Sequence, residues 1–467
     1  MGKEERIPVI AVFDVGKTNK KLFLFDEQYH VVFERSARFI ETVDEDGYPC
    51  ENLDSLRLSI FDLLREVFAH PAYELRAINF ASYGASLVYI DEHGQPLTQL
   101  QNYLKPYPAD LKREFYEQYG GEEIFAAQTA SPVLDSLNSG MQLYRLKKEK
   151  PEVFEKVKYA LHLPQYLSFL ISGKAYSDKT SLGCHTNLWD FEKDNYHEWL
   201  NKESMLVKMA PMAASDHVSP ANFPGNNYNV GVGLHDSSAA LIPYLKCFKE
   251  PFVLLSTGTW CISLNPFNQQ PLTTAELDQD VLSYMQYEGK AVKASRLFSG
   301  YHYEQQTKRI AAHFNCDVLA FRNLTYVAAK ANQILVGQPK NKVENWRNLS
   351  FENRDLNGFK DETEAYYQLM ADLVLQQYYS TQLVLHGTSA KRIFVDGGFS
   401  RNAVFMNLLA TLFPDKEVYA AHMPQATAIG AALVIHQIWN KKPLPNDIIE
   451  LKLYTPTDQK IKNEFTI

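Results

Sequence analysis

Asp14 follows an apolar run, residues 8–13, and short polar residues and a glycine separate it from the next apolar run. A glycine in such a turn exposes backbone N–H groups, which together form a nest for an anion such as phosphate. An acid in the same place can hold Mg²⁺, directly or through water. The candidate residues of this turn are Asp14, Gly16, Thr18, Asn19 and Lys21. A plain β-hairpin with a polar turn would contain the same residue types, and the phosphate-loop pattern G-x-x-x-x-G-K-[ST] is absent.

Two segments of the C-terminal half repeat this arrangement of an apolar run and a glycine turn. Residues 252–256 lead into a hydroxyl-bearing turn suited to a terminal phosphate, and residues 392–395 lead through an acid into a glycine pair. Paired glycines between a strand and a helix let a flat ligand approach the backbone closely. The candidate contacts are Gly258 and Thr259 in the first segment, and Gly397, Gly398 and Asn402 in the second. Ordinary turn and helix packing is the alternative for both segments.

His235 and Asp236 come between a glycine-rich run, residues 231–233, and a small-residue stretch typical of a packed helix. A carboxylate fixed at the start of that helix could act as a general base facing a cleft. The structural alternative for Asp236 is a helix cap. His235 could contact a substrate or serve as a buried structural histidine, and the sequence leaves both open.

The elements that must position these residues form a repeated pattern. The N-terminal half has apolar strands, an amphipathic helix over residues 55–69 and further strands, followed by a more helical middle. The C-terminal half begins again with a strand and a glycine turn, then has a long helix over 363–385, a strand, and a small-residue helix over 425–439. The sequence therefore predicts an α/β protein of duplicated architecture. We place the domain boundary after residue 243, which gives domains 1–243 and 244–467 with a cleft between them.

Composition narrows the classes of function that fit. The 467 residues include 47 Lys and Arg against 55 Asp and Glu, a net charge of −8, which argues against a partner that is nucleic acid or an anionic membrane. No apolar stretch approaches the ~18 residues of a membrane span. Five cysteines show no C-x-x-C spacing, so we expect free thiols in a reducing compartment, and hence a cytoplasmic metabolic protein.

The order of these motifs, from Asp14 to Ala432, resembles the FGGY carbohydrate kinases of the actin, hexokinase and heat-shock ATPase superfamily. The resemblance implies two ribonuclease H-like (actin-like ATPase) domains, with mixed β-sheets flanked by helices and an active site in the interdomain cleft. It also implies ATP and Mg²⁺ as cofactors and a ketose as the small-molecule partner. A homodimer is compatible with this interpretation.

The same resemblance assigns roles to individual residues. The turn at Asp14 would be the first phosphate motif, with Asp14 as the Mg²⁺ ligand, and the turn at Gly258 would be the second. The glycine pair after Asp396 would lie along the adenosine. Asp236 would take the proton from the sugar hydroxyl. Sugar contacts would come from Tyr83, Gly84, Ser86, His235 and Asp236.

Some positions depart from the usual family pattern. Lys17 stands where many members have Thr, and residues 104–107 replace the Asn-Asp-x-Arg sugar segment of xylulose and glycerol kinases. Residues 256–260 look like the rhamnulose kinase branch, which favours a deoxy-ketohexose such as L-rhamnulose or L-fuculose over xylulose or a similar pentulose. Two rivals stay open: an actin-like or chaperone-like ATPase that phosphorylates no sugar, and a sugar-binding sensor without turnover.

Overall fold

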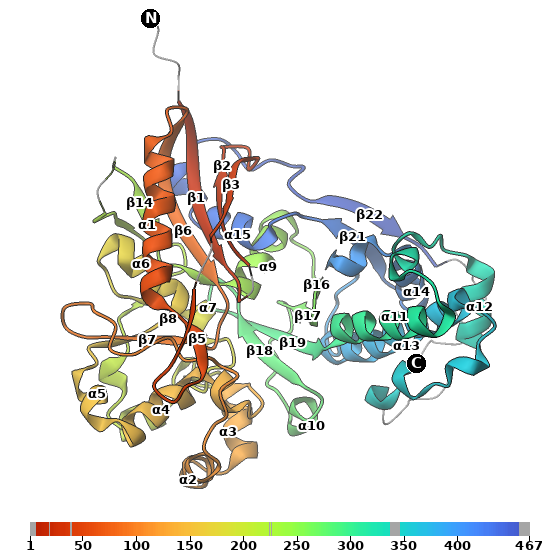
Figure 1. Ribbon diagram of the computed structural model, residues 1–467, viewed down its shortest axis with the longest axis horizontal. Helices are drawn as coiled ribbons and strands as arrows, with labels where there is room; N and C mark the ends of the chain where they lie inside the picture. The colour runs from red at the N-terminus through yellow and green to blue at the C-terminus, as the bar shows by residue number, and fades with distance from the viewer. Residues whose placement is uncertain are drawn as a thin grey trace, which may run out of the picture.

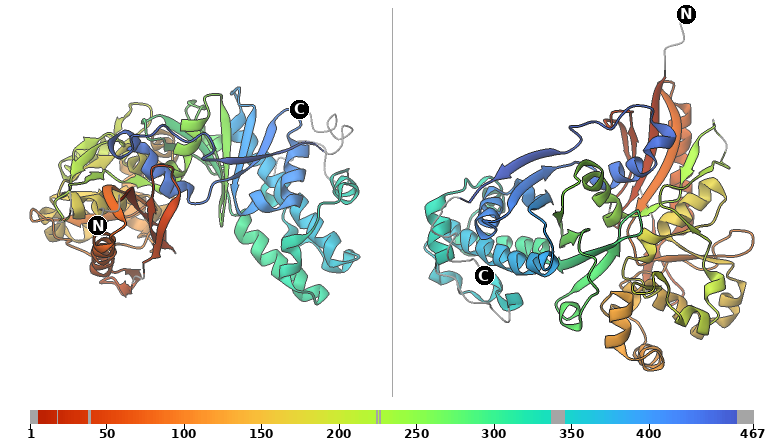
Figure 2. Two further views of the ribbon diagram at one scale, coloured as in Figure 1. Left: turned by 90° about the horizontal axis from the view of Figure 1, so that it is seen from above. Right: turned by 180° about the vertical axis from the view of Figure 1, so that it is seen from behind.

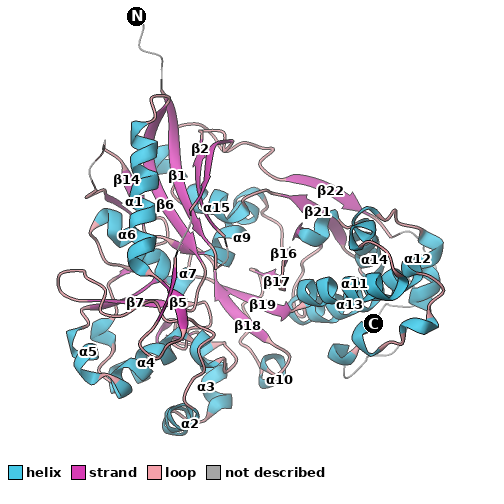
Figure 3. Cartoon of the chain, in the orientation of Figure 1, coloured by secondary structure: helices cyan, strands magenta, loops and turns pink. Residues whose placement is uncertain are grey.

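The computed structural model describes residues 6–17, 19–37, 40–223, 225, 227–336 and 346–456. Two seven-stranded sheets with both parallel and antiparallel neighbours organise this part of the chain. The first sheet comes from the N-terminal half and the second from the C-terminal half, and helices flank both (Figures 1 and 3). The predicted α/β class with two mixed sheets is confirmed.

The first sheet is built around β1, which pairs antiparallel with β2 and parallel with β6. Its strand order is β13-β14-β6-β1-β2-β3, and β15 also pairs with β6. The strands are β1 (Ile7–Val15), β2 (Lys20–Phe25), β3 (Val31–Ser36), β6 (Tyr73–Ser82), β13 (Val218–Pro220), β14 (Asn229–Gly231) and β15 (Leu234–His235).

Helices bury both faces of this sheet, which explains why β1 is apolar without interruption. Val9, Ala11 and Phe13 point into a core shared with helices α1 and α6, whereas Ile10 and Val12 point into a second core shared with α9 and α15. These helices are α1 (Leu53–Ala69), α6 (Leu163–Ser172), α9 (Asp236–Cys247) and α15 (Ala426–Val434). The first sheet is therefore completed by a helix from the far end of the chain.

The second sheet repeats the plan of the first. β16 pairs antiparallel with β17 across a turn at Gly258 and parallel with β20, just as β1 pairs with β2 and β6. Its strands, in spatial order, are β18 (Val281–Met285), β19 (Ala291–Leu297), β17 (Cys261–Asn265), β16 (Phe252–Thr257), β20 (Arg392–Gly397), β21 (Glu417–His422) and β22 (Glu450–Tyr454). The main helices beside it are α11 (Ser299–Phe314), α13 (Glu362–Leu385) and α14 (Ala403–Leu412).

A separate aromatic core lies in the middle of the chain, beside the first sheet. Its members include the fully buried Phe115, Tyr144 and Trp199. The elements around it are β7 (Leu87–Ile90), α2 (Ala109–Gln118), α3 (Glu122–Thr129), α4 (Ser139–Glu149), α5 (Pro151–Lys156), β8 (Tyr159–His162), α7 (Lys179–Leu182) and α8 (Trp199–Lys202). Smaller elements are β4 (Glu41–Val43), β5 (Pro49–Glu51), α10 (Thr274–Leu277), α12 (Ala328–Val336) and α16 (His436–Trp439).

Helix α9 carries the chain from one sheet to the other, and it crosses α15 at an unusually close point. Pro243, inside α9, has no N–H, so the carbonyl of Ala239 four residues earlier lacks its helical donor. The Cα of Gly430 in α15 approaches that carbonyl so closely that a Cβ there would lie 1.8 Å from the oxygen. Cα–H groups make weak hydrogen bonds to carbonyls at such crossings.

The predicted domain boundary after residue 243 falls within helix α9. Figure 2 shows α9 and α15 together between the two sheets from two further directions.

Two helical stretches are divided in the structure. In the helical middle of the chain α4 ends at Glu149 and α5 starts at Pro151, because a proline cannot continue the hydrogen-bonding of the preceding turn. The helix expected over 425–439 becomes α15 and α16, separated by Ile435. No helix within the described residues combines the length and the apolar character needed to cross a bilayer.

The α9–α15 contact predicts that Gly430→Ala destabilises the protein. The added Cβ meets the Ala239 carbonyl at 1.8 Å, so backbone must move, and overpacking of this kind costs about 1–3 kcal/mol. Denaturant unfolding would measure the loss. Gly358→Ala is the matched control, because a Cβ at Gly358 meets nothing within 4 Å. Equal stability of the two variants would show that α9 and α15 can move apart at no cost.

Candidate active site

Asp14 and Asp236 lie near the same end of β6 because the strands that lead to them, β1 and β15, both pair with β6. In β1, Asp14 is the register partner of Ala81 in β6, and Leu234 of β15, two residues before Asp236, also pairs with Ala81. Both carboxylates therefore emerge at the carboxyl end of β6. Burial, together with the charge of Asp236, raises the pKa of Asp14 to about 7, while Lys21 acts in the opposite direction.

Asp236 is the first residue of α9, and its carboxylate is held from two sides. Oδ1 accepts hydrogen bonds from the Ser237 backbone N–H at 2.5 Å and from its hydroxyl at 3.3 Å. Nε2 of His235 lies 3.4 Å from the same oxygen. The side chain stays one-third exposed, at 33%. The carboxylate is thus fixed in direction yet accessible, as a general base must be.

His235 is buried, and its ring is enclosed by neighbours. Nε2 lies 2.9 Å from Sγ of Cys184, and the ring stacks on Tyr284 with centroids 5.7 Å apart. Gly84 is closed in by the same pair, because a Cβ there would lie 3.0 Å from both Cys184 Sγ and the His235 ring. Burial lowers the pKa of His235, so its ring is neutral beside Asp236. These contacts give Gly84 and His235 a structural role, and a sugar contact by either residue stays a prediction.

Lys17, which the sequence marks as a departure from the family pattern, lies beside Tyr83 together with Glu51 and Tyr103, two residues that the sequence did not single out. The Lys17 ammonium lies over the rings of Tyr83 and Tyr103, 5.6 and 5.7 Å from their centroids, and 3.3 Å from Glu51 Oε1. The pKa of Tyr103 is raised by burial, then by Asp236, then by Glu51, so the ring lies near both carboxylates. Ser86 lies close to the Tyr83 hydroxyl and lowers its pKa against the stronger effects of burial and Glu51. Glu51 and Tyr103 carry no spacing signal, since folding alone brings them here.

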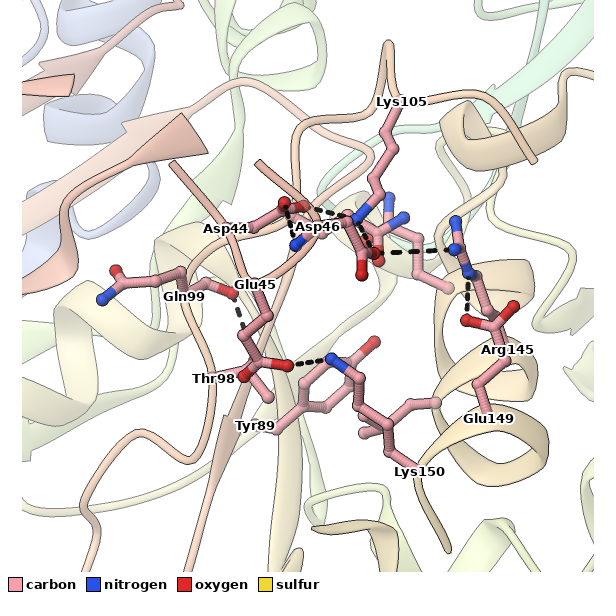
Figure 4. A pocket seen from close by; sticks show the side chains of 13 residues that line it. Asp44, Glu45, Asp46, Tyr89, Thr98, Gln99, Lys105, Arg145, Glu149 and Lys150 are labelled. Carbon is pink, nitrogen blue, oxygen red and sulfur yellow. Dashed lines mark hydrogen bonds and ion pairs between the residues drawn. The ribbon is translucent and has the colours of Figure 1, made fainter. Parts of the chain in front are cut away.

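Glu51 reaches the site on a hairpin, β4–β5, whose turn is held by ion pairs around a small polar pocket of about 60 Å³ (Figure 4). Lys105 contacts Asp44 and Asp46, both at 2.5 Å, and Lys150 pairs with Glu45. Lys105 is almost fully buried, so its pairs are less screened than surface pairs. The ion pairs fix the hairpin and, through it, the position of Glu51.

The second group of predicted residues lies at the carboxyl ends of β16 and β20. Gly397 has φ of 87°, and a Cβ there would lie 1.9 Å from the Thr257 carbonyl, so glycine is required. Thr257 Oγ1 accepts from the Phe399 N–H at 3.0 Å, which joins the two turns. The predicted contacts Gly258, Thr259, Gly397 and Gly398 therefore lie together on the second sheet.

Several predicted contacts have other partners in the structure. Asn402 Oδ1 caps α14 by accepting from the Val404 and Phe405 N–H groups, and its amide donates to the Tyr366 hydroxyl at 2.7 Å. Lys21 pairs with Glu34 at 2.6 Å. The Asn19 carbonyl accepts from the Gly16 N–H at 2.9 Å and closes the first turn. Thr18 lies outside the described residues. Nucleotide contacts by these four residues stay predictions.

Asp14 immediately precedes the first turn, and the described residues contain no cluster of three or more metal-ligating side chains. Mg²⁺ is commonly held by one or two carboxylates together with phosphate oxygens and water. The donor set at Asp14 therefore fits a metal that arrives with a nucleotide.

Rhamnulokinases are among the similar proteins. One from Halalkalibacterium halodurans is 26% identical over 264 residues, which is 53% of this chain and 54% of that protein, so the match spans about half of the relative. One from Oceanobacillus iheyensis is 22% identical over 417 residues, 84% of each chain.

Solved structures share the fold over nearly the whole chain. A carbohydrate kinase from Novosphingobium aromaticivorans has a TM-score of 0.78 at 23% identity, covering 99% of this chain and 98% of that one. A ligand-bound xylulose kinase from Lactobacillus acidophilus has a TM-score of 0.77 at 16% identity, covering 98% and 95%. The predicted two-domain actin-like ATPase fold is thus confirmed.

The family models divide the chain between them. Residues 9–214 match the N-terminal domain of the FGGY family of carbohydrate kinases, and residues 249–443 match the C-terminal domain of carbohydrate kinase FGGY. With both domains present in order, the chain belongs to the FGGY family of carbohydrate kinases.

Proposed function

We propose that this protein transfers the γ-phosphoryl group of MgATP to a hydroxyl group of a ketose. The observation that carries the proposal is the pair Asp14 and Asp236, one beside a phosphate-type turn and the other fixed and accessible at the start of α9. The family membership and the rhamnulokinase relatives support it. The five free cysteines support a cytoplasmic location.

In this mechanism, Asp236 orients the acceptor hydroxyl and takes its proton as the sugar oxygen bonds to the γ-phosphorus. The bond from that phosphorus to the β-phosphate oxygen breaks, and ADP leaves. Phosphoryl transfer depends mainly on positioning and on charge stabilisation. Backbone N–H groups of the two glycine turns would bind phosphate oxygens, and Lys21, near Asp14, adds positive charge. Mg²⁺, when bound through Asp14, would neutralise charge on the phosphates.

The first prediction concerns the base. Asp236→Asn should lower the sugar-dependent turnover number by about 10²–10⁴-fold, because general-base help is typically of that size. ADP binding, measured by calorimetry at a pH well above the Asp14 pKa, should change little. Asp415→Asn is the matched control, since Asp415 is an exposed carboxylate that pairs with Lys416 outside the site. If Asp236→Asn kept more than about a tenth of its sugar-dependent rate, another group would be the base.

A second prediction concerns pH. Because the Asp14 pKa is about 7, Mg²⁺-dependent ADP binding should weaken as the pH falls through that value, where the carboxyl gains a proton and loses metal affinity. Asp236 raises that pKa, so Asp236→Asn should move the midpoint to lower pH. The titration of the nucleotide itself is common to both proteins and cancels in the comparison. Identical midpoints would mean that Asp14 does not hold the metal.

A third prediction concerns the acceptor. In a coupled ADP assay with a panel of L- and D-ketoses, we expect the highest kcat/KM for a deoxy-ketohexose such as L-rhamnulose or L-fuculose. A clear preference for xylulose or another pentulose would contradict the deoxy-ketohexose prediction and identify the protein as a pentulose kinase. ADP release stimulated by polypeptide and not by sugar would instead support the actin-like or chaperone-like ATPase, and ketose binding without ADP formation would indicate a sensor.

A further inference from the structure

Lys17 occupies a position between the nucleotide turn and the candidate acceptor site, so its direction decides which ligand it can serve. Its backbone belongs to the turn that begins at Gly16, where the N–H of Gly16 donates to the Asn19 carbonyl. Its side chain leaves that turn and ends over Tyr83 and Tyr103, 3.3 Å from Glu51. The ammonium is therefore directed away from its own turn and toward the hairpin that carries Glu51.

The residues around this ammonium also lie next to the candidate base. Burial raises the pKa of the Tyr103 hydroxyl, and the nearby carboxylates of Asp236 and Glu51 raise it further. The rings of Tyr83 and Tyr103 meet edge to face, with centroids 5.9 Å apart. Lys17, Glu51 and these two rings thus form one surface that ends at Asp236.

Some polar atoms of this surface have no well-formed hydrogen bond among the described residues. Oε2 of Glu51 and the hydroxyl of Tyr83 are buried without a well-formed hydrogen bond among the described residues, although Glu51 lies near enough to raise the Tyr83 pKa. Buried polar atoms of this kind are normally satisfied by a partner, a ligand or water. Lys17 keeps 29% of its side chain exposed, and an ammonium has three N–H donors. Within the described part of the chain, the Lys17 ammonium donates to one acceptor, Glu51 Oε1.

Two ammonium groups lie beside Glu51. Lys20 is buried, with Nζ 3.4 Å from Oε1 and 3.2 Å from the Lys17 carbonyl. Glu51 is thus shared between Lys17 and Lys20, and Lys17 is the more exposed of the two. An oxygen atom that carries negative charge or a lone pair is the natural partner for such a group.

We propose that Lys17 determines specificity in the acceptor site, where its ammonium donates a hydrogen bond to an acceptor oxygen remote from the hydroxyl that Asp236 deprotonates. This inference rests on the proposed function, since it assumes that Asp236 marks the reacting hydroxyl. The oxygen can be a hydroxyl of a neutral ketose or the carboxylate of a sugar acid, and both present lone pairs to the same donor. Glu51 holds the ammonium in place, and the two tyrosine rings stabilise its charge.

The test compares Lys17→Met with Lys17→Arg and with a matched control. Lys202→Met is that control, because Lys202 also pairs with a carboxylate, Glu198, and lies 5.9 Å from a tyrosine centroid, but outside the site. For each variant, KM for ATP and for the preferred ketose are measured, and ketose, aldonate and ADP binding are followed by calorimetry without turnover.

We expect Lys17→Met to weaken acceptor binding about tenfold or more, because hydrogen bonds to charged groups are among the stronger ones. The KM for ATP and the affinity for ADP should change less than about twofold. A contact made only to the acceptor affects only the acceptor's KM when it is removed. Lys17→Arg should retain part of the affinity, because it keeps the charge with a different shape. Lys202→Met should match the wild type. Tighter aldonate than ketose binding by the wild type would identify the partner oxygen as a carboxylate, and the reverse would identify a hydroxyl.

Two outcomes would overturn this role. An unchanged acceptor affinity in Lys17→Met would do so, and so would a rise in KM for ATP as large as that for the acceptor, which would place Lys17 on the nucleotide. The proposed function fails separately, if acceptors bind and lose affinity in Lys17→Met but no ADP forms. If neither ketose nor aldonate binds the wild-type protein, both proposals are wrong.

Discussion

The crossing of α9 and α15 is the contact on which both parts of the site depend. One helix, α9, begins with Asp236, packs on Gly430 at Ala239, and reaches the second sheet at Tyr244, whose hydroxyl donates to Asp396 Oδ2 at 3.1 Å. The candidate base and the acid before the glycine pair are therefore joined by a single rigid element. Only a glycine lets α15 come close enough to hold that element against the first sheet.

A second buried link supports the same region. Asn79 in β6 is fully buried, and its amide donates to the Ala431 carbonyl of α15 at 2.7 Å. Its Oδ1 accepts from the Gly233 N–H at 3.2 Å, just before the strand that leads to Asp236. The strand β6, the helix α15 and the segment that leads to Asp236 are thus joined through one side chain. A buried polar network whose members are all hydrogen-bonded favours one arrangement of the elements that it joins. Moving any of these elements would leave a buried polar atom without a partner.

The sequence predicted the parts of this protein that depend on local pattern. The alternation of apolar strands and glycine turns was enough for the class and the duplicated plan, whereas only the family resemblance placed Asp14 and Asp236 in one site. The sequence could not predict Glu51 or Tyr103, because each stands in a short polar segment without periodicity and reaches the site through long-range packing. Asn402 stands where the sequence suggested a nucleotide contact, and in the structure its side chain caps helix α14. The overall charge of −8 also says little about the site, where Lys17, Lys20 and Lys21 supply local positive charge.

The hairpin that carries Glu51 stands apart from the two large sheets. β4 and β5 form their own two-stranded sheet, and ion pairs at the turn hold it in place. A short hairpin outside both main sheets can be exchanged with less effect on the hydrophobic cores than a strand of either sheet, provided that the buried Lys105 and its two partners are replaced together. The hairpin that carries Glu51 is therefore separable from the frame of the two main sheets. Under the proposed function, natural or laboratory evolution could change the range of acceptors by replacing residues 41–51, while Asp14, Asp236 and the α9–α15 crossing stay as they are.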